Sequence, residues 1–183
     1  MRKRVYLSFA FGLFLLAGNL LAQNPSLEYE VKAAFLHNFV NFIDWPARTF
    51  PSSAAPVRLC VFGRDPFGGA LERMARAESI GGRPREIQTT DSISELRTCH
   101  VVFIPNTEQS RSAGVLDSLG TTAVLTVGES ATFLQSGGII NFAIERNRVR
   151  FDINLPRAEE SDLKISSKLL RLARTTRTVQ ARD

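Results

Sequence analysis

Short apolar segments that alternate with turn-and-helix segments are the feature that most constrains the fold of this chain. Strands buried on both faces read as continuous apolar runs, and they alternate with helices in parallel sheets that helices cover on both sides. The pattern therefore predicts an α/β fold with three layers and a mostly parallel sheet. The expected strands are Val57–Phe62, Arg85–Thr89, His100–Ile104 and Thr122–Val127, and the helical segments between and after them are Phe67–Ala77, Ser92–Arg97, Gly114–Leu119 and Ser130–Gln135.

The pattern changes after Gly137-Gly138, where two further strands flank a possible turn at Arg146-Asn147. Asparagine tolerates the left-handed conformation that a two-residue hairpin needs. In the second strand, Arg148–Asn154, apolar and polar residues alternate strictly, which is typical of a strand with one face in water. We expect Ile139–Glu145 and Arg148–Asn154 to form an antiparallel hairpin at the margin of the sheet. A last helix, Glu159–Arg174, should follow it.

The segment after Asn24-Pro25-Ser26 predicts a helix that continues to Asp44 and stops at Trp45-Pro46, because the residue before proline avoids the helical conformation. Its apolar residues cover more than one face. We expect this helix to be buried on two sides within the chain; the alternative is contact with a second chain. The apolar positions are Val31, Ala34, Phe35, Leu36, Phe39, Val40, Phe42 and Ile43.

The first 22 residues read as a secretory signal peptide. Arg2, Lys3 and Arg4 precede the apolar stretch 5–16, and we place cleavage after Ala22. A retained membrane anchor is the alternative, but the uninterrupted apolar run is shorter than the roughly 20 residues that a span needs. We therefore expect a periplasmic protein with a single domain over residues 23–174 and a polar tail over 175–183.

Charge gives little support for nucleic-acid binding. The chain has 23 Lys+Arg and 18 Asp+Glu, which gives a formal charge of +5. Three of these cations lie in the signal peptide, which contains no acid, so part of the excess is a targeting feature. The expected mature chain keeps only a small positive excess, and we predict no nucleic-acid partner.

No motif predicts catalysis. The segment Gly128-Glu129-Ser130-Ala131-Thr132 resembles a hydrolase nucleophile turn, but Thr132 carries a Cβ where that turn requires glycine, so Ser130 is interpreted as a helix cap. The spacing of Gly63 and Gly68 resembles a phosphate loop, but no Lys-Ser/Thr follows. Two cysteines and two separated histidines, His37 and His100, offer no clear zinc site. The sequence predicts no catalytic residue, metal or cofactor.

Ordered sequence blocks over residues 29–174 nevertheless resemble the YfiR family of bacterial periplasmic proteins. Asp162 stands where relatives usually have glycine, and a second cysteine pair of some relatives is missing. The blocks are Val31-Lys32-Ala33-Ala34-Phe35-Leu36, Asp44-Trp45-Pro46, Leu59-Cys60-Val61-Phe62-Gly63, Asp65-Pro66-Phe67-Gly68, Cys99-His100-Val101-Val102-Phe103-Ile104, Val149-Arg150-Phe151-Asp152-Ile153-Asn154 and the stretch from Leu163 to Ala173.

The resemblance implies a non-enzymatic regulator that binds and represses a membrane-bound signalling protein. The best-known relative acts on the periplasmic part of an inner-membrane diguanylate cyclase, and an outer-membrane lipoprotein can sequester it. The cyclase then makes cyclic di-GMP, which favours biofilm. The partner need not be a cyclase; a sensor kinase is another candidate. The alternative function is a periplasmic small-molecule binding module that uses the carboxyl ends of the strands.

A disulfide between Cys60 and Cys99 is expected. Cys60 lies in the first strand and Cys99 directly before the third, and these strands can be close in one sheet. An exported protein also folds in an oxidising compartment. The alternative is two buried free thiols.

The final hairpin and the helix after it are the predicted partner-binding surface. An amphipathic hairpin at a sheet margin can accept contacts from another chain, and positive charge would steer an acidic partner towards it. The alternatives are a solvated basic face on the last helix, and a contact or homodimer through the apolar face that carries Phe39, Phe42 and Trp45. The candidate partner-binding residues are Arg146, Arg148, Arg150, Asp152, Lys164 and Lys168.

Overall fold

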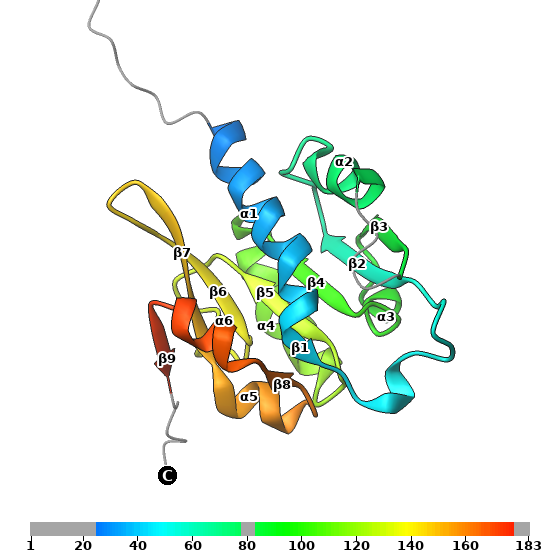
Figure 1. The fold of residues 1–183 in the computed structure, drawn as a ribbon. Helices are drawn as coiled ribbons and strands as arrows, with labels where there is room; N and C mark the ends of the chain where they lie inside the picture. The colour runs from blue at the N-terminus through cyan, green and yellow to red at the C-terminus, as the bar shows by residue number, and fades with distance from the viewer. Residues whose placement is uncertain (1–24, 78–82, 178–183) are drawn as a thin grey trace, which may run out of the picture.

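A seven-stranded sheet lies at the centre of the computed structural model, which describes residues 25–77 and 83–177 (Figure 1). Its order is β3-β2-β4-β5-β6-β7-β9. The first five strands in this order are parallel, β7 is antiparallel to β6, and β9 is parallel to β7. The strands are β2 (Val57–Phe62), β3 (Arg85–Thr90), β4 (Val101–Ile104), β5 (Leu125–Gly128), β6 (Ile140–Glu145), β7 (Arg148–Asn154) and β9 (Thr175–Arg177).

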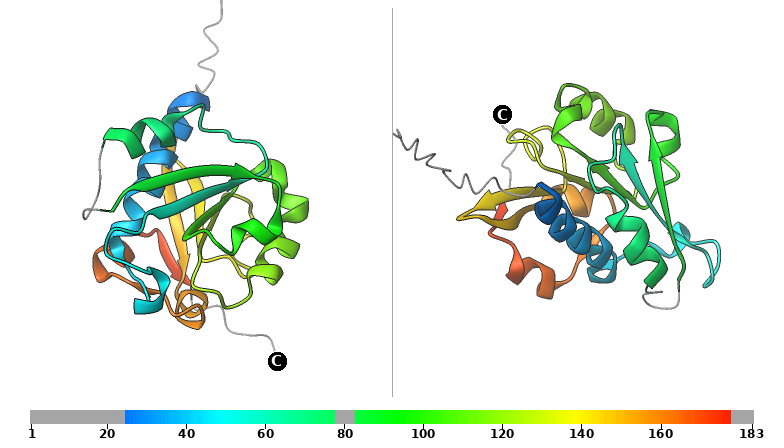
Figure 2. Two further views of the ribbon diagram at one scale, coloured as in Figure 1. Left: turned by 90° about the vertical axis from the view of Figure 1, so that its right-hand side faces the viewer. Right: turned by 90° about the horizontal axis from the view of Figure 1, so that it is seen from above.

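Helices cover both faces of this sheet, so the predicted three-layer α/β class is confirmed (Figure 2). Alternate residues of β2 show the layers: Leu59 and Val61 face one core cluster, and Cys60 and Phe62 face the other. The first cluster includes α1 (Pro25–Phe39), α2 (Ala70–Ala77) and α6 (Ser167–Leu172). The second includes α3 (Ile93–Leu96) and α4 (Gln109–Leu119). The central strands are buried on both sides, as their apolar composition predicts.

The predicted last helix, Glu159–Arg174, is wrong. The structure has α5 (Leu155–Glu160), then the two-residue strand β8 (Lys164–Ile165), then α6. Asp162 adopts a positive φ of 57°, which stops a right-handed helix, and the Ser166 side chain accepts a hydrogen bond from Lys168 N to begin the next one. The intervening β8 pairs antiparallel with β1 (Ile43–Asp44).

Several predicted boundaries also differ. Helix α1 ends at Phe39, and the chain continues through a 3-10 turn, Val40–Phe42, because Ile43 pairs with Ile165 of β8. Helix α4 begins five residues before the predicted start at Gly114, and β5 begins at Leu125. The segment 130–135 forms turns, not a helix. Two other 3-10 turns are Ala47–Thr49 and Asn106–Glu108.

The chain beyond the predicted last helix is part of the sheet. Residues 175–177 begin the predicted polar tail, yet they form β9 beside the second half of β7. The hairpin is therefore not wholly at the sheet margin. The predicted signal peptide, residues 1–22, lies outside the described residues. Within residues 25–77 and 83–177, no helix has the length and apolar character needed to cross a membrane.

Candidate partner-binding surface

The tip of the β6–β7 hairpin carries a group of exposed arginines. Glu145 pairs with Arg148 in the strand register, which leaves Arg146 and Asn147 as the two-residue turn. Both turn residues have positive φ, 48° and 65°, as this type of hairpin requires. Arg146, Arg148 and Arg150 are all exposed, and we call these three residues the charged hairpin tip. Glu145, also exposed, is the acid next to them.

The two faces of the hairpin tip differ in chemistry. Residues opposite each other in an antiparallel pair share a face, so Glu145 and Ala143 lie with Arg148 and Arg150. The other face points to the main core. There Ile144 is 45% exposed, because the hairpin extends beyond the sheet. The tip therefore offers a partner cations on one face and an apolar side chain on the other.

Half of the outer edge of β7 has no neighbouring strand in the described part of the chain. Strand β9 pairs only with residues Asp152, Ile153 and Asn154 of β7, and Arg174 N donates to Phe151 O at 2.8 Å. Residues 148–150 lie beyond this pairing. An open strand edge is a place where a second chain can add main-chain hydrogen bonds.

Asp152 is not part of this exposed surface, which corrects the sequence-based expectation. Asp152 is only 5% exposed, and its carboxylate accepts hydrogen bonds from Arg174 and from the Thr175 hydroxyl. Burial alone raises the pKa of Asp152, but these hydrogen bonds and the charge of Arg174 outweigh it, so the net pKa is lowered. Strict alternation predicts a solvent-facing side chain here, but the chain at 174–175 covers that face.

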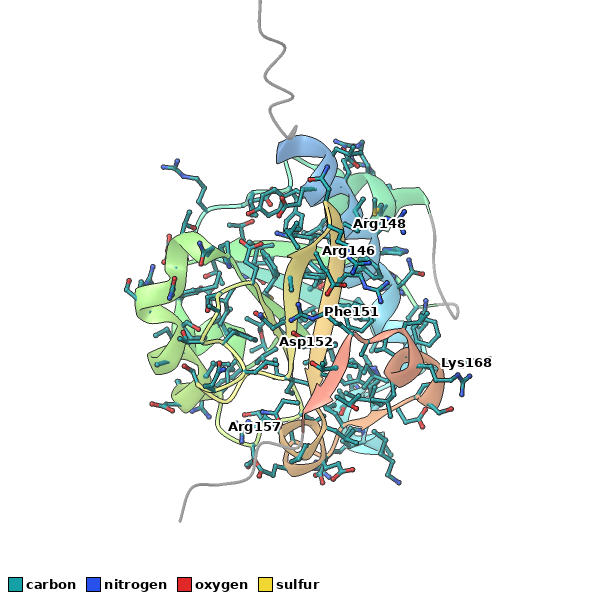
Figure 3. All side chains as sticks on the ribbon, turned by 90° about the vertical axis from the view of Figure 1, so that its left-hand side faces the viewer. Arg146, Arg148, Phe151, Asp152, Arg157 and Lys168 are labelled. Atoms are coloured by element: carbon teal, nitrogen blue, oxygen red, sulfur yellow. A yellow bond between two sulfur atoms is a disulfide. The ribbon has the colours of Figure 1, made fainter. Side chains whose placement is uncertain are left out.

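Lys164 and Lys168 are exposed but are not beside the charged hairpin tip. Lys164 lies in β8, paired with Asp44 of β1, at the far end of α1 from the hairpin. Lys168 lies on α6, and Figure 3 shows it well apart from Arg146 and Arg148. Their predicted proximity rested on one continuous helix after the hairpin. The break at Asp162 places them elsewhere.

The apolar alternative surface is smaller than the sequence suggests. Phe39 is in the core, and Phe42 and Trp45 are partly buried against it. What remains open is a groove of about 570 Å³ between α1, α2 and α6. Val31, Phe35, Met74 and Leu172 are among the residues that line it. Helix α1 is thus buried on more than one side, with Lys32 and His37 also covered.

A buried ionic cluster at the carboxyl ends of the strands was missed by the sequence analysis. Lys32 is only 4% exposed and forms ion pairs with Glu28 and Glu129. The Tyr29 hydroxyl donates to Glu129 at 2.9 Å, and Asn106 N donates to the same carboxylate oxygen at 2.8 Å. Burial, with Glu129 next to it, raises the pKa of Tyr29. The nearest signal in the sequence is Lys32 itself, a charged residue directly between Val31 and Ala33 of the expected helix.

Two cavities border this cluster near the carboxyl ends of β4 and β5. One, beside Tyr29 and Lys32, measures about 230 Å³; the other, which Glu129 also lines, measures about 350 Å³, near the lower limit of the usual 300–1,000 Å³ of a small-molecule site. The glycines near it serve packing. A Cβ on Gly128 or on Gly138 would lie within 2.4 Å of the Phe133 ring. The absence of a side chain at both positions therefore leaves room for that ring. The Gly-Glu-Ser-Ala-Thr segment therefore has a packing explanation, and Ser130 is buried.

The predicted disulfide is present between Cys60 and Cys99, whose Cα atoms are 6.0 Å apart. Cys60 is central in β2, and Cys99 precedes β4, the adjacent parallel strand. Both residues are buried. Among the described residues, no group of three His, Cys, Asp or Glu side chains is placed to hold a metal ion.

Comparison with known proteins identifies related sequences and folds. Residues 29–174 match the protein family described as YfiR/HmsC-like, which bears out the resemblance seen in the sequence. The fold is similar to the ABC domain in complex with L-Trp from Streptococcus pneumonia, with a TM-score of 0.53 at 11% identity, over 82% of this chain and 60% of that one. It is also similar to a conserved domain protein from Vibrio cholerae O1 biovar eltor str. N16961, with a TM-score of 0.54 at 11% identity, over 81% and 60%. This chain spans about 60% of the length of both, and these likenesses show the fold alone.

Proposed function

Because the chain belongs to the YfiR/HmsC-like family of periplasmic regulatory proteins, we propose that it binds and represses a membrane-bound signalling protein. The proposed target is the periplasmic part of a diguanylate cyclase, with a sensor kinase as the other candidate. Repression would keep cyclic di-GMP low and disfavour biofilm. An outer-membrane lipoprotein that sequesters the regulator would relieve it. We propose that the regulator acts through protein contacts, without a catalytic residue, cofactor or metal of its own.

The observation that carries this proposal is the charged hairpin tip, together with the open outer edge of β7 at residues 148–150. Residues 148–150 pair with β6 on one edge and have no strand on the other, outer edge in the described chain, and Arg148 and Arg150 are exposed there. Main-chain groups along a strand edge can pair with an extended segment of a partner, and arginines can hold acidic side chains on it. We propose this edge, not α6, as the principal contact.

The proposed domain organisation keeps the boundaries expected from the sequence, with one change at the C-terminal side. Residues 1–22 would direct export and be removed, and residues 23–174 would form a single domain. The sheet continues into β9, so we extend the proposed folded unit to residue 177.

Paired charge-reversal variants test the contact. Arg148→Glu/Arg150→Glu should lose capture of the membrane partner from envelope extract, while Lys164→Glu/Lys168→Glu, with the same change in charge, should retain it. All four side chains are exposed, so both variants should keep the native circular dichroism. If the hairpin variant still captures the partner and the lysine variant does not, the contact lies on β8 and α6 and not on the hairpin.

Cellular cyclic di-GMP tests the target. Deleting the gene should raise cyclic di-GMP and biofilm, and the hairpin variant should fail to restore the low level. An unchanged cyclic di-GMP level after deletion would exclude a diguanylate cyclase. A sensor kinase would then be sought among proteins that the wild-type chain captures and the hairpin variant does not.

A further inference from the structure

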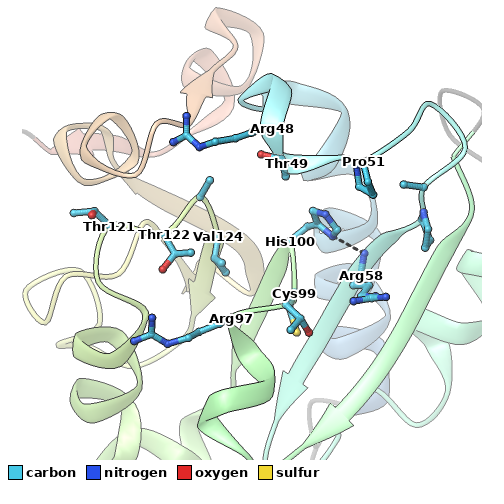
Figure 4. A pocket seen from close by; sticks show the side chains of 14 residues that line it. Arg48, Thr49, Pro51, Arg58, Arg97, Cys99, His100, Thr121, Thr122 and Val124 are labelled. Carbon is cyan, nitrogen blue, oxygen red and sulfur yellow. Dashed lines mark hydrogen bonds between the residues drawn. The ribbon is translucent and has the colours of Figure 1, made fainter.

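A hollow of about 460 Å³ lies at the amino ends of β2, β4 and β5 (Figure 4). Arg58 of β2, His100 directly before β4 and Val124 directly before β5 are among its lining residues. The charged hairpin tip is at the other end of the sheet. Strand β6 pairs with the last residues of parallel β5 and continues beyond them. The hollow is therefore separate from the proposed partner surface.

The charged residues that line this hollow are all arginines. Three arginines, Arg48, Arg58 and Arg97, are among its lining residues, and no Asp or Glu is. Figure 4 shows Arg48 and Arg97 on opposite walls, with Thr121 and Thr122 on the side between them. Arg48 forms an exposed ion pair with Asp162, and Arg58 forms one with Glu86. Within the described residues Arg97 makes no ion pair; it donates to the Ser118 carbonyl.

The rest of the lining combines apolar side chains with four threonines and a histidine. The His100 ring stacks on Phe50, with centroids 4.6 Å apart, and its Nδ1 accepts a hydrogen bond from Arg58 N at 2.9 Å. An Nδ1 that accepts carries no proton, so His100 is neutral here and the arginines supply the charge. Cys99 also lines the hollow, and its disulfide holds the start of β4 against β2. Further lining residues are Pro51, Ala55, Pro56 and Ala123.

We propose that this hollow binds a small organic anion, with its carboxylate or phosphate group at Arg97 and its apolar part against the proline and alanine side chains. Guanidinium groups bind such oxyanions through paired, charge-assisted hydrogen bonds. The volume lies within the range of small-molecule sites. This ligand site is additional to the proposed regulation of a partner and does not depend on it.

Nuclear magnetic resonance titration of the oxidised mature protein tests the site. Phenyl phosphate should give saturable shifts of the amides of Arg97, His100 and Val124, and benzyl alcohol, a neutral ring compound, should not. Benzoate and inorganic phosphate then distinguish a carboxylate site from a phosphate site. Absence of saturable shifts with all three anions would overturn the proposal.

Variants locate the binding. Arg97→Gln should weaken phenyl phosphate binding by about tenfold or more, because it removes a charge-assisted hydrogen bond. Arg64→Gln is the matched control, since Arg64 is exposed in the turn after β2 at the opposite end of the sheet. Equal affinity in Arg97→Gln and the wild type would overturn the site. If Arg97→Gln fails to fold, Arg97→Lys keeps the charge but removes the paired guanidinium hydrogen bonds, and it should also weaken binding. Arg148→Glu/Arg150→Glu should leave anion binding unchanged.

Discussion

The Arg174 guanidinium donates to both carboxylate oxygens of Asp152 and so attaches the last strand of the sheet to β7. The Nε–Oδ1 distance is 3.0 Å, and the Thr175 hydroxyl donates to Oδ1 at 2.7 Å. Strand β9 has three residues, so its main-chain pairing with β7 is short. The ion pair therefore adds a side-chain attachment to this short main-chain pairing.

Asp152→Asn should lower the free energy of unfolding by about 1–3 kcal/mol, the cost of weakening hydrogen bonds to a charged group. The lower part of this range is expected, because Arg174 is partly exposed and solvent screens the pair. Urea unfolding measures the change. Asp117→Asn, in an exposed position on α4, is the matched control and should change stability little. Equal stability of the two variants would contradict the assigned role of Asp152.

The same carboxylate should make stability depend on pH in the acid range. The pKa of Asp152 is lowered in the folded state, so its contribution is complete above its unfolded pKa of about 3.9 and is lost as pH falls through the folded value. Urea midpoints measured across the acid range should therefore fall more steeply for the wild type below about pH 4 than for Asp152→Asn. If the urea midpoints of the wild type and of Asp152→Asn change in parallel with pH, Asp152 has the same pKa in the folded and unfolded states.

Sequence patterns predicted those parts of the fold that depend on neighbouring residues. The apolar run of β2, the hairpin turn at Arg146-Asn147 and the pairing of Cys60 with Cys99 all followed from local composition or compartment. The arginines of the charged hairpin tip were also predicted to be exposed, and they are.

Apart from the disulfide, features that depend on distant residues were not predicted. Asp152 alternates like a solvent-facing residue, but Arg174 and Thr175, 22 and 23 positions later, cover it. Thr175 and Thr176 are β-branched and favour a strand, but a polar segment near the chain end resembles a tail until its partner strand is known. Helix propensity across residues 159–174 likewise gave no indication that Ile165 would pair with Ile43.

Replacing Lys32 alone should lower the free energy of unfolding more than replacing Lys32 and Glu129 together. Lys32→Met leaves the Glu129 carboxylate buried without its cation, at an expected cost of about 3–5 kcal/mol. Adding Glu129→Gln removes that uncompensated charge, so the double variant should regain part of the loss. Chemical denaturation of the two single variants and the double variant measures the coupling. Additive losses would show that the two side chains do not stabilise one another.

The disulfide should contribute strongly to stability. It joins residues 39 positions apart, and closing a loop of this length is worth about 4 kcal/mol in the chain-entropy model. Cys60→Ala/Cys99→Ala should lose close to this amount in urea unfolding. Thiol titration of the denatured, unreduced wild type should find no reactive thiol. Two thiols per chain would contradict the bond.

Charge at the hairpin tip should act mainly on the rate of association with the captured partner. Exposed arginines attract an acidic surface over distances set by the Debye length, which is about 30 Å at 0.01 M salt and about 8 Å at 0.15 M. The association rate should therefore fall over this range, while the dissociation rate, set by short-range contacts, changes less. Arg148→Gln/Arg150→Gln should flatten the salt dependence, and Lys164→Gln/Lys168→Gln should not. Surface plasmon resonance measures both rates. An association rate that is independent of salt in the wild type would instead favour the apolar groove between α1, α2 and α6 as the contact.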